Sequence, residues 1–267
     1  MTTPLPTQQR LCVVKIGGNI LDDESRLDNF INQFAALEGN KILIHGGGKI
    51  ATELAKELQV EQQLIEGRRI TDAATLRIVT MVYAGWINKK LVAALQQAGT
   101  NAFGITGVDG NLIEAGKRNS ANIDYGFVGD VVLVNTKLIE SLLSAKLVLV
   151  IAPITHDTKG QLLNTNADTI AQEIAKALAS AYNVSLIFSF EKAGVLMDVA
   201  KEESVIRELN AADFARMKEQ RLVHAGMIPK LDNAFRALES GVNKVIIGQA
   251  ENLTDLISGR SGTTLQS

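Results

Sequence analysis

The sequence predicts an α/β protein, a three-layer αβα sandwich with a mainly parallel central sheet. Short apolar runs rich in Val, Ile and Leu alternate along the chain with segments whose apolar residues recur at helical spacing. The apolar runs are nearly continuous, which is typical of parallel strands covered by helices on both faces. Glycine clusters end two of these runs, and ligands bind at the carboxyl ends of strands in such sheets.

The first half of the chain alternates strands with helices and then makes an excursion. The expected strands are residues 11–16, 41–44 and 101–106. The expected helices cover residues 27–37, residues 50–58 and a long segment that Thr71 and Asp72 can cap and that ends near residue 97. Two further β-like runs predict a hairpin, and they are residues 112–114 and 127–133, with the polar residues 117–124 between them.

The second half repeats this alternation. The expected strands are residues 147–154, residues 184–190 and a last strand at residues 244–247. The expected helices are residues 167–181 and 228–238. A lobe boundary is expected near residues 160–166, although the composition does not change there.

Composition excludes several classes of protein. The 267 residues carry a formal net charge of −2, and 46% are hydrophobic and 21% charged, which is ordinary for a globular chain. This balance gives no reason to expect nucleic acid or a membrane surface as a partner. Cys12 is the single cysteine, so no internal disulfide can form. The sequence has no secretory signal, and its longest apolar stretches fall short of the about 20 residues of a membrane span, so we expect a soluble cytoplasmic protein.

The two glycine turns, KIGGN and HGGGK, indicate an anion-binding site. Glycine lets backbone N–H groups approach an anion closely, and a helix that follows adds partial positive charge. Neither turn is a P-loop, because Ile50 stands where that motif has Ser or Thr. The segment from Gly46 to Ala51 also fits a loose dinucleotide fingerprint, with Glu66 as its acidic residue, so a nicotinamide-binding oxidoreductase is the rival interpretation.

Several charged or polar residues are candidates for chemistry near these turns. Lys15 lies inside an apolar strand just before the first glycine turn, where a charge is costly unless it has a task. Asn164 and Asp168 open a helix, where capping alone requires one such residue. An arginine pair, Arg68 and Arg69, could bind a carboxylate. The three histidines show no metal-ligand spacing, so no metal site within the protein is expected.

A series of segments, in order over nearly the whole chain, resembles the motifs of the amino acid kinase family, and within it those of the acetylglutamate kinases. The segments are VVKIGGN, ILIHGGGKIATEL, EGRRITDAATLRIVTMVYAGWINKKLV, GVDGNLIEA, GFVGDV, LLNTNADTIA, HAGMIPKL and GTTL. Their order and spacing favour this family over the dinucleotide-binding interpretation. The resemblance implies the amino acid kinase type of αβα sandwich.

The resemblance also implies an activity and a set of residues. The enzyme would transfer the γ-phosphoryl group of ATP, with Mg²⁺, to the side-chain carboxylate of N-acetyl-L-glutamate, giving an acyl phosphate of arginine biosynthesis. The implied catalytic residues are Lys15, Asp168 and Lys230. The implied substrate-binding residues are Gly46, Gly47, Arg69 and Asn164. The implied nucleotide-binding residues are Gly17, Gly18, Glu191 and Gly194, of which Glu191 stands where the family usually has Asp.

The resemblance implies two lobes and a homodimer. Residues 1–163 would bind the acylated amino acid and dimerise, and residues 164–267 would bind ATP. Arginine-inhibited relatives carry an extra N-terminal helix that links dimers into hexamers, and Pro4 and Pro6 disfavour such a helix here. We therefore expect a homodimer that arginine does not inhibit.

Other activities remain open on sequence grounds. An N-succinyl-L-glutamate kinase would share every motif, and the residues 117–130 hairpin is expected to help form the acyl pocket. Another family member acting on carbamate, aspartate or a nucleotide is disfavoured by Arg69 with Asn164. A non-catalytic amino-acid sensor on the same fold has no need of Lys15, Asp168 and Lys230 together.

Overall fold

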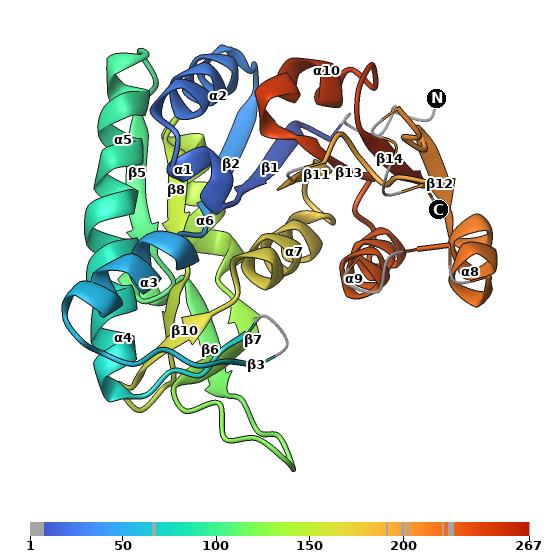
Figure 1. Cartoon of the computed structure of the whole chain (residues 1–267). Coiled ribbons are helices and arrows are strands. Elements are labelled where there is room, and N and C mark those ends of the chain that lie inside the picture. The colour runs from blue at the N-terminus through green and yellow to red at the C-terminus, as the bar shows by residue number, and fades with distance from the viewer. Residues whose placement is uncertain are drawn as a thin grey trace.

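The computed structural model describes residues 8–65, 68–190, 192–198, 201, 203–220, 222–223 and 227–266. Within this part of the chain, eight strands form one large sheet, and all neighbours are parallel except β13 and β14 (Figure 1). In spatial order the strands are β12 (Glu208–Asn210), β14 (Thr263–Gln266), β13 (Lys244–Gln249), β11 (Asn183–Phe190), β1 (Arg10–Ile16), β2 (Asn40–His45), β8 (Val148–Ala152) and β5 (Ala102–Thr106).

Helices cover both faces of this sheet. In Figure 1, α2 and α10 lie above the sheet and α7 and α9 below it. The helices on the first face are α1 (Gly18–Leu21), α2 (Glu24–Ala36), α3 (Gly48–Glu57), α4 (Ala73–Thr80), α5 (Asn88–Gln97) and α10 (Leu253–Ile257). Those on the second face are α6 (Thr136–Ser144), α7 (Ala167–Leu178), α8 (Ala211–Glu219) and α9 (Ile228–Glu239).

Alternate strand residues point to the two helical layers. In β1, Leu11 and Val13 belong to the core under α7 and α9, whereas Val14 and Ile16 belong to the core under α2 and α5. Each strand therefore buries both of its faces, which requires the continuous apolar runs seen in the sequence. The predicted three-layer α/β architecture with a mainly parallel sheet is confirmed.

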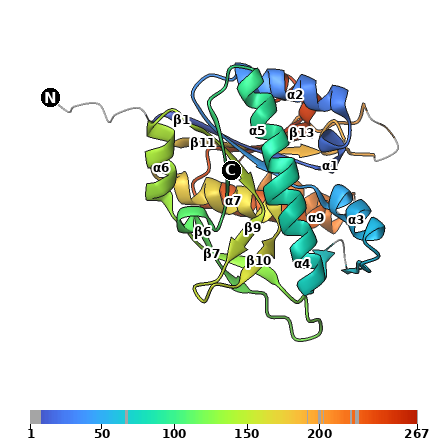
Figure 2. The ribbon, with the colours of Figure 1, turned by 90° about the vertical axis from the view of Figure 1, so that its left-hand side faces the viewer.

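One long helical run crosses the first face, as the sequence predicts. It extends over Ala73–Gln97 as α4, the π-helical segment η1 (Met81–Ile87) and α5, and Figure 2 shows it passing in front of the sheet. Asp72 caps its start by accepting a hydrogen bond of 2.7 Å from the Thr75 N–H. By length and composition this run could cross a membrane, contrary to the sequence expectation, but buried core helices of soluble proteins pass the same test.

A smaller closed sheet lies beside the end of α4 (Figure 2). Its β6 and β7 are antiparallel, which confirms the predicted hairpin, and the short ribbon of β3 and β4 lies outside it. These strands are β6 (Ile113–Lys117), β7 (Val128–Val134), β9 (Ile154–His156), β10 (Leu162–Thr165), β3 (Leu64–Ile65) and β4 (Arg68–Arg69). Short 3-10 segments occur at η2 (Asp109–Asn111) and η3 (Ala250–Asn252).

The structure corrects three details of the expected strands and helices. The expected strand at residues 147–154 is two strands, β8 and β9, which belong to different sheets and meet at Pro153, a residue without an N–H for a ladder. The strand at residues 244–247 is not the last, because β14 follows and pairs with it in antiparallel fashion. Several short or peripheral elements were not expected from the sequence, namely α1, α6, α8, α10, β3, β4, β10 and β12.

Candidate active site

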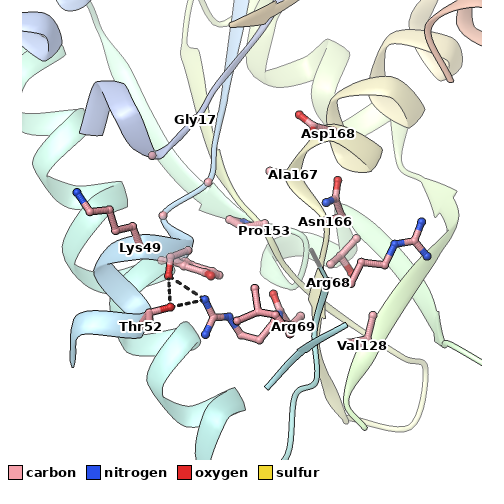
Figure 3. Close-up of a pocket in the computed structure, with 18 of the residues that line it drawn as sticks. Gly17, Lys49, Thr52, Arg68, Arg69, Val128, Pro153, Asn166, Ala167 and Asp168 are labelled. Atoms are coloured by element: carbon pink, nitrogen blue, oxygen red, sulfur yellow. Dashed lines mark hydrogen bonds between the residues drawn. The ribbon is translucent and has the colours of Figure 1, made fainter. Parts of the chain in front are cut away.

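A cavity of about 450 Å³ opens where β1 and β2 end and α7 begins. Both glycine turns line it, together with Lys15 and Asp168, so residues about 150 positions apart in the sequence share one wall. Eight of the residues expected from the sequence line this cavity, namely Lys15, Gly17, Gly18, Gly46, Gly47, Arg69, Asn164 and Asp168. Figure 3 shows the cavity with Arg69 and Thr52 on one side and Asp168 and Asn166 on the other.

Lys15 and Asp168 form an ion pair in this wall. The Lys15 Nζ lies 2.8 Å from Asp168 Oδ1, and their side chains are 14% and 32% exposed. Lys15 stands at the carboxyl end of β1, and Asp168 lies in the first turn of α7, whose Asn166 cap accepts a hydrogen bond of 3.0 Å from the Thr169 N–H. The ammonium group has three donors, so the pair leaves Lys15 with donors for an anion in the cavity.

The charge state of Asp168 follows from its neighbours. Burial acts to raise the pKa of this carboxyl, but the charge and hydrogen bond of Lys15, with the charge of Lys230, outweigh burial and hold the pKa below its ordinary value. Lys230 lies in α9, its side chain is exposed, and it is not among the described residues that line the cavity. Asp168 is therefore a carboxylate at neutral pH that both lysines stabilise.

The two glycine turns are tied to each other. The N–H of Gly46 donates to the carbonyl oxygen of Ile16 over 3.1 Å. Gly47 has a φ of 146°, and a Cβ there would lie 2.2 Å from Ile87 Cδ1, so glycine is required by both backbone and space. Gly18 and Gly48 begin α1 and α3, so two helix N-termini meet beside the cavity.

Arg69 is anchored against the second glycine turn. Its Nη2 donates to the carbonyl oxygen of Gly48 and to Thr52 Oγ1, each over 2.8 Å, and its Nη1 donates to Gln62 Oε1 (Figure 3 draws the first two contacts). Burial raises the pKa of Tyr83 next to this guanidinium, which keeps the phenol protonated. Arg69 therefore lines the cavity in a rotamer that the protein already holds.

Arg118 is a cavity residue that sequence reasoning missed. Its guanidinium makes a bidentate pair with Asp130, with Nε 3.0 and 3.1 Å from the two oxygens, and lies 5.7 Å from the centre of the Tyr125 ring. It belongs to the polar residues 117–124 of the expected hairpin, so the expectation that this hairpin forms part of the pocket could have identified it. Asn164 lines the same region, with Nδ2 donating to Thr71 Oγ1 over 3.0 Å.

The cavity attracts anions. Among the described residues that line it, five are basic and one is acidic; they are Lys15, Lys49, Arg68, Arg69, Arg118 and Asp168. Cations held by protein partners cost little reorganisation when an anion binds. The same walls offer glycine N–H groups and the start of α7, so the arrangement suits a ligand with several negative groups.

Some expected residues lie elsewhere or outside the described part. Gly194 does not line the cavity; it packs where a Cβ would lie 2.7 Å from Thr263 Oγ1 and 2.8 Å from Val205 Cγ1. Glu191 lies outside the described residues. His156 Nε2 donates to Asn111 Oδ1 over 2.8 Å near the surface, away from this site.

The described side chains do not form a resident metal site. No group of three or more His, Cys, Asp or Glu gathers in a ligating arrangement within the part of the chain that the structure describes. The one carboxylate that lines the cavity there is already paired with Lys15. A divalent cation would therefore need most of its ligands from a bound phosphate and from water.

Comparison with known proteins agrees with the sequence resemblance. The model of the amino acid kinase family matches residues 10–249. The chain is 52% identical to the acetylglutamate kinase of Parabacteroides distasonis over 92% of this chain and 96% of that one. It is 48% identical to that of Phocaeicola vulgatus over 97% and 99% of the two chains.

Solved structures show the same fold. A protein from Streptococcus mutans superposes with a TM-score of 0.76 at 27% identity, covering 96% of this chain and 98% of that chain. Carbamate kinase from Giardia lamblia, solved with AMP-PNP, superposes with a TM-score of 0.67 at 12% identity over 97% and 98% of the chains, which speaks for the fold alone. The family match spans most of the sequence and the fold agrees with it, so the chain belongs to the amino acid kinase family.

Proposed function

We propose that this protein transfers the γ-phosphoryl group of ATP to the side-chain carboxylate of N-acetyl-L-glutamate, a step of arginine biosynthesis. The observation that carries the proposal is the cationic cavity built around the Lys15–Asp168 pair and two glycine turns. The chain is about half identical to several acetylglutamate kinases, and this similarity supports N-acetyl-L-glutamate as the acceptor.

The reaction requires no general base. The acceptor carboxylate is ionised at neutral pH, since such groups have a pKa near 4. One of its oxygens attacks the γ-phosphorus, the bond from that phosphorus to the bridging oxygen breaks, and ADP leaves with the electron pair. The main barrier is the repulsion between the acceptor carboxylate and the phosphates, which are both anionic. Cationic side chains and N–H donors of this chain would reduce that repulsion.

Lys15, Lys230 and Asp168 form the proposed catalytic group. Lys15 neutralises the transferring phosphoryl group from the side of β1, and Lys230 does so from the side of α9. Asp168 accepts a hydrogen bond from Lys15 and stays charged beside both lysines, so it holds them in position. Gly17 and Gly18 would contribute N–H groups to the phosphates. On the substrate side, Gly47 would contribute its N–H group, and Gly46, whose own N–H is bonded to Ile16, would line the cavity with its backbone.

Arg69 and Asn164 are the proposed substrate-binding side chains. The forked guanidinium of Arg69 suits the α-carboxylate of the acceptor, and its anchoring to Gly48 and Thr52 lowers the entropy lost on binding. We assign the acylated amino acid to a lobe of about residues 1–163. We assign ATP to a lobe of about residues 164–267, in which Gly194 and Glu191 would approach the nucleotide.

Mg²⁺ is proposed to arrive as part of the nucleotide substrate. The described side chains offer no ligand cluster of their own, whereas phosphate oxygens and water are the ligands that Mg²⁺ prefers in kinases. Bound in this way, the ion neutralises charge on the phosphates. The positioning of the acceptor remains the task of this chain's cationic side chains and glycine turns.

A cytoplasmic homodimer is the proposed state of the enzyme. Met81 and Trp86 on the π-helical segment are 47% and 63% exposed, which is unusual for large apolar side chains on a helix that packs on a sheet. A second copy covering this face would bury them. Sedimentation equilibrium should give twice the chain mass, and Trp86→Glu should shift it toward the monomer.

The activity test is trapping of the acyl phosphate with hydroxylamine in the presence of ATP and Mg²⁺. N-acetyl-L-glutamate and N-succinyl-L-glutamate are offered in parallel. Lys176→Met, at a half-buried position of α7 that does not line the cavity, serves as the control for Lys15→Met. We expect hydroxamate from N-acetyl-L-glutamate with the wild-type and control proteins. Turnover of the succinyl compound alone, or of neither, would contradict the proposal.

A further inference from the structure

A buried polar chain links the long helix to the second glycine turn. His45 is the last residue of β2 and is 0% exposed, and Asn88 is the first residue of α5 and is 1% exposed. Asn88 Nδ2 lies 3.4 Å from His45 Nε2, and His45 Nδ1 lies 2.8 Å from the carbonyl oxygen of Gly46. Burying two polar side chains is costly unless their hydrogen bonds are made. The role of this buried His45–Asn88 pair therefore requires an explanation.

The direction of each hydrogen bond follows from its partners. The Gly46 carbonyl can only accept, so His45 Nδ1 carries the proton, and Nε2 accepts from Asn88 Nδ2. Asn88 also donates to the Val150 carbonyl oxygen over 2.9 Å and accepts from Lys89 Nζ over 2.9 Å. Burial lowers the pKa of His45 to about 4, and the ring is therefore neutral, as this arrangement requires.

The Gly46 carbonyl sets the direction of the next N–H group. Because a trans peptide places its C=O and N–H on opposite sides, a Gly46 oxygen turned toward His45 turns the Gly47 N–H away from His45. Gly46 and Gly47 both line the cavity. No protein acceptor for the Gly47 N–H is found among the described residues. A flip of this peptide would replace the donor with a carbonyl oxygen.

The π-helical segment closes the other side of the turn. A Cβ on Gly47 would lie 2.2 Å from Ile87 Cδ1 and 3.2 Å from Tyr83 Cδ1, and both residues belong to this segment. Asn88 follows directly, so the same helix that leaves no room for a side chain at residue 47 also supplies the bond to His45. The turn is thus held by packing on one side and by hydrogen bonds on the other.

We infer that His45 and Asn88 are positioning residues that hold the Gly46–Gly47 peptide with its N–H directed at the anion in the cavity. They act through the backbone and do not touch the substrate. The inference rests on the proposed function for its readout, since the anion in question is the reacting carboxylate or phosphoryl group. It is a statement about one peptide plane, and variants of His45 test it directly.

Three substitutions of His45 separate positioning from packing. Asn places an amide nitrogen the same number of bonds from Cα as Nδ1 and can donate to Gly46, whereas Gln reaches the place of Nε2 but not that of Nδ1. Leu fills similar space with neither group. We expect kcat to fall by about 10- to 100-fold for His45→Leu and His45→Gln, with a smaller change in KM, and His45→Asn to recover most of it.

A purely structural role predicts a different result. It would lower the melting temperature of all three variants without ranking kcat as Asn above Gln, and equal kcat values for Asn and Gln would overturn the inference. If the wild-type protein fails to turn over N-acetyl-L-glutamate, the proposed function falls instead. In that case the inference is tested by binding: the amide resonance of Gly47 is followed in ¹⁵N-glycine-labelled protein while ATP or N-acetyl-L-glutamate is added. A response of that resonance in the wild type that persists in His45→Gln would also overturn the inference.

Discussion

Two lysines on neighbouring strands show how the two ends of one sheet differ. Lys15 stands near the carboxyl end of β1 and Lys41 near the amino end of β2, where it pairs in register with Cys12. The Lys41 Nζ donates to the carbonyl oxygens of Phe34, Ala35 and Leu37 over 2.7 to 2.9 Å, so its donors are used on the last turn of α2. Lys15 has one carboxylate partner and faces the cavity.

A lysine in an apolar strand is therefore not by itself a sign of function. At the amino end of the sheet, the charge completes a helix C-terminus, where cations are favoured. At the carboxyl end, the helices that follow the strands begin, so the backbone there offers N–H groups to an anion. The Lys15 ammonium at this end is available to the same anion. Position in the sheet separates the two roles.

Lys15→Met should remove most of the activity, because Lys15 lies at the end of the sheet that faces the cavity. We expect kcat to fall by about 10³-fold, because a preorganised donor to the transferring phosphoryl group is lost. The fold should persist, since Asp168 remains near Lys230. Hydroxamate formation measures the activity, and circular dichroism verifies the fold. Activity within a few-fold of the wild type would remove Lys15 from the catalytic group.

Lys41→Met should have the opposite outcome. We expect the free energy of unfolding to fall by about 3 kcal/mol, because three carbonyl groups at the end of α2 lose a buried donor. The kcat of the folded variant should stay near that of the wild type. Urea denaturation with a parallel activity assay tests both parts, and Lys56→Met, an exposed change on α3, is the control. A variant as stable as the control would contradict the capping role.

The buried His45 should make the stability of the protein depend on pH. In the folded protein burial lowers the pKa of His45 to about 4, against an ordinary value near 6.5, so the unfolded chain binds more protons between these values. The stability that depends on a neutral His45 is fully present above pH 6.5 and is lost as pH falls toward 4. We expect the free energy of unfolding to be about 2 kcal/mol lower at pH 5 for this reason. Unfolding curves at pH 7 and pH 5 should show this loss in the wild type and a smaller one in His45→Asn.

Much of the fold could be read from the sequence because buried parallel strands and amphipathic helices leave periodic patterns. The β1 strand, the long helix and the β6–β7 hairpin are examples. Strands such as β12 and β14, with 3 and 4 residues, are too short to show a period. The π-helical turn also has no sequence pattern, and within it Tyr83 is buried while Trp86 is exposed.

The site was predictable to a different degree. The glycine turns and Lys15 stand out in the sequence because their residue types are costly or unusual where they occur. Their meeting with Asp168 came from family resemblance, since no local pattern encodes a contact over such a separation. Arg118 was missed because an arginine in a polar hairpin looks like solvated surface until its pair with Asp130 turns it to the cavity.

Arg69 lies between the two lysines in character, and it gives the smallest expected effect. Like Lys41 it donates to protein acceptors, Gly48 and Thr52 among them, and like Lys15 it lines the cavity. We expect Arg69→Lys to raise KM for N-acetyl-L-glutamate by about tenfold, because the ammonium lacks the fork that binds a carboxylate while held by the protein. The KM for ATP should stay unchanged in the same initial-rate measurements. Equal rises in both KM values would mean that Arg69 supports the second glycine turn as a whole rather than the acceptor.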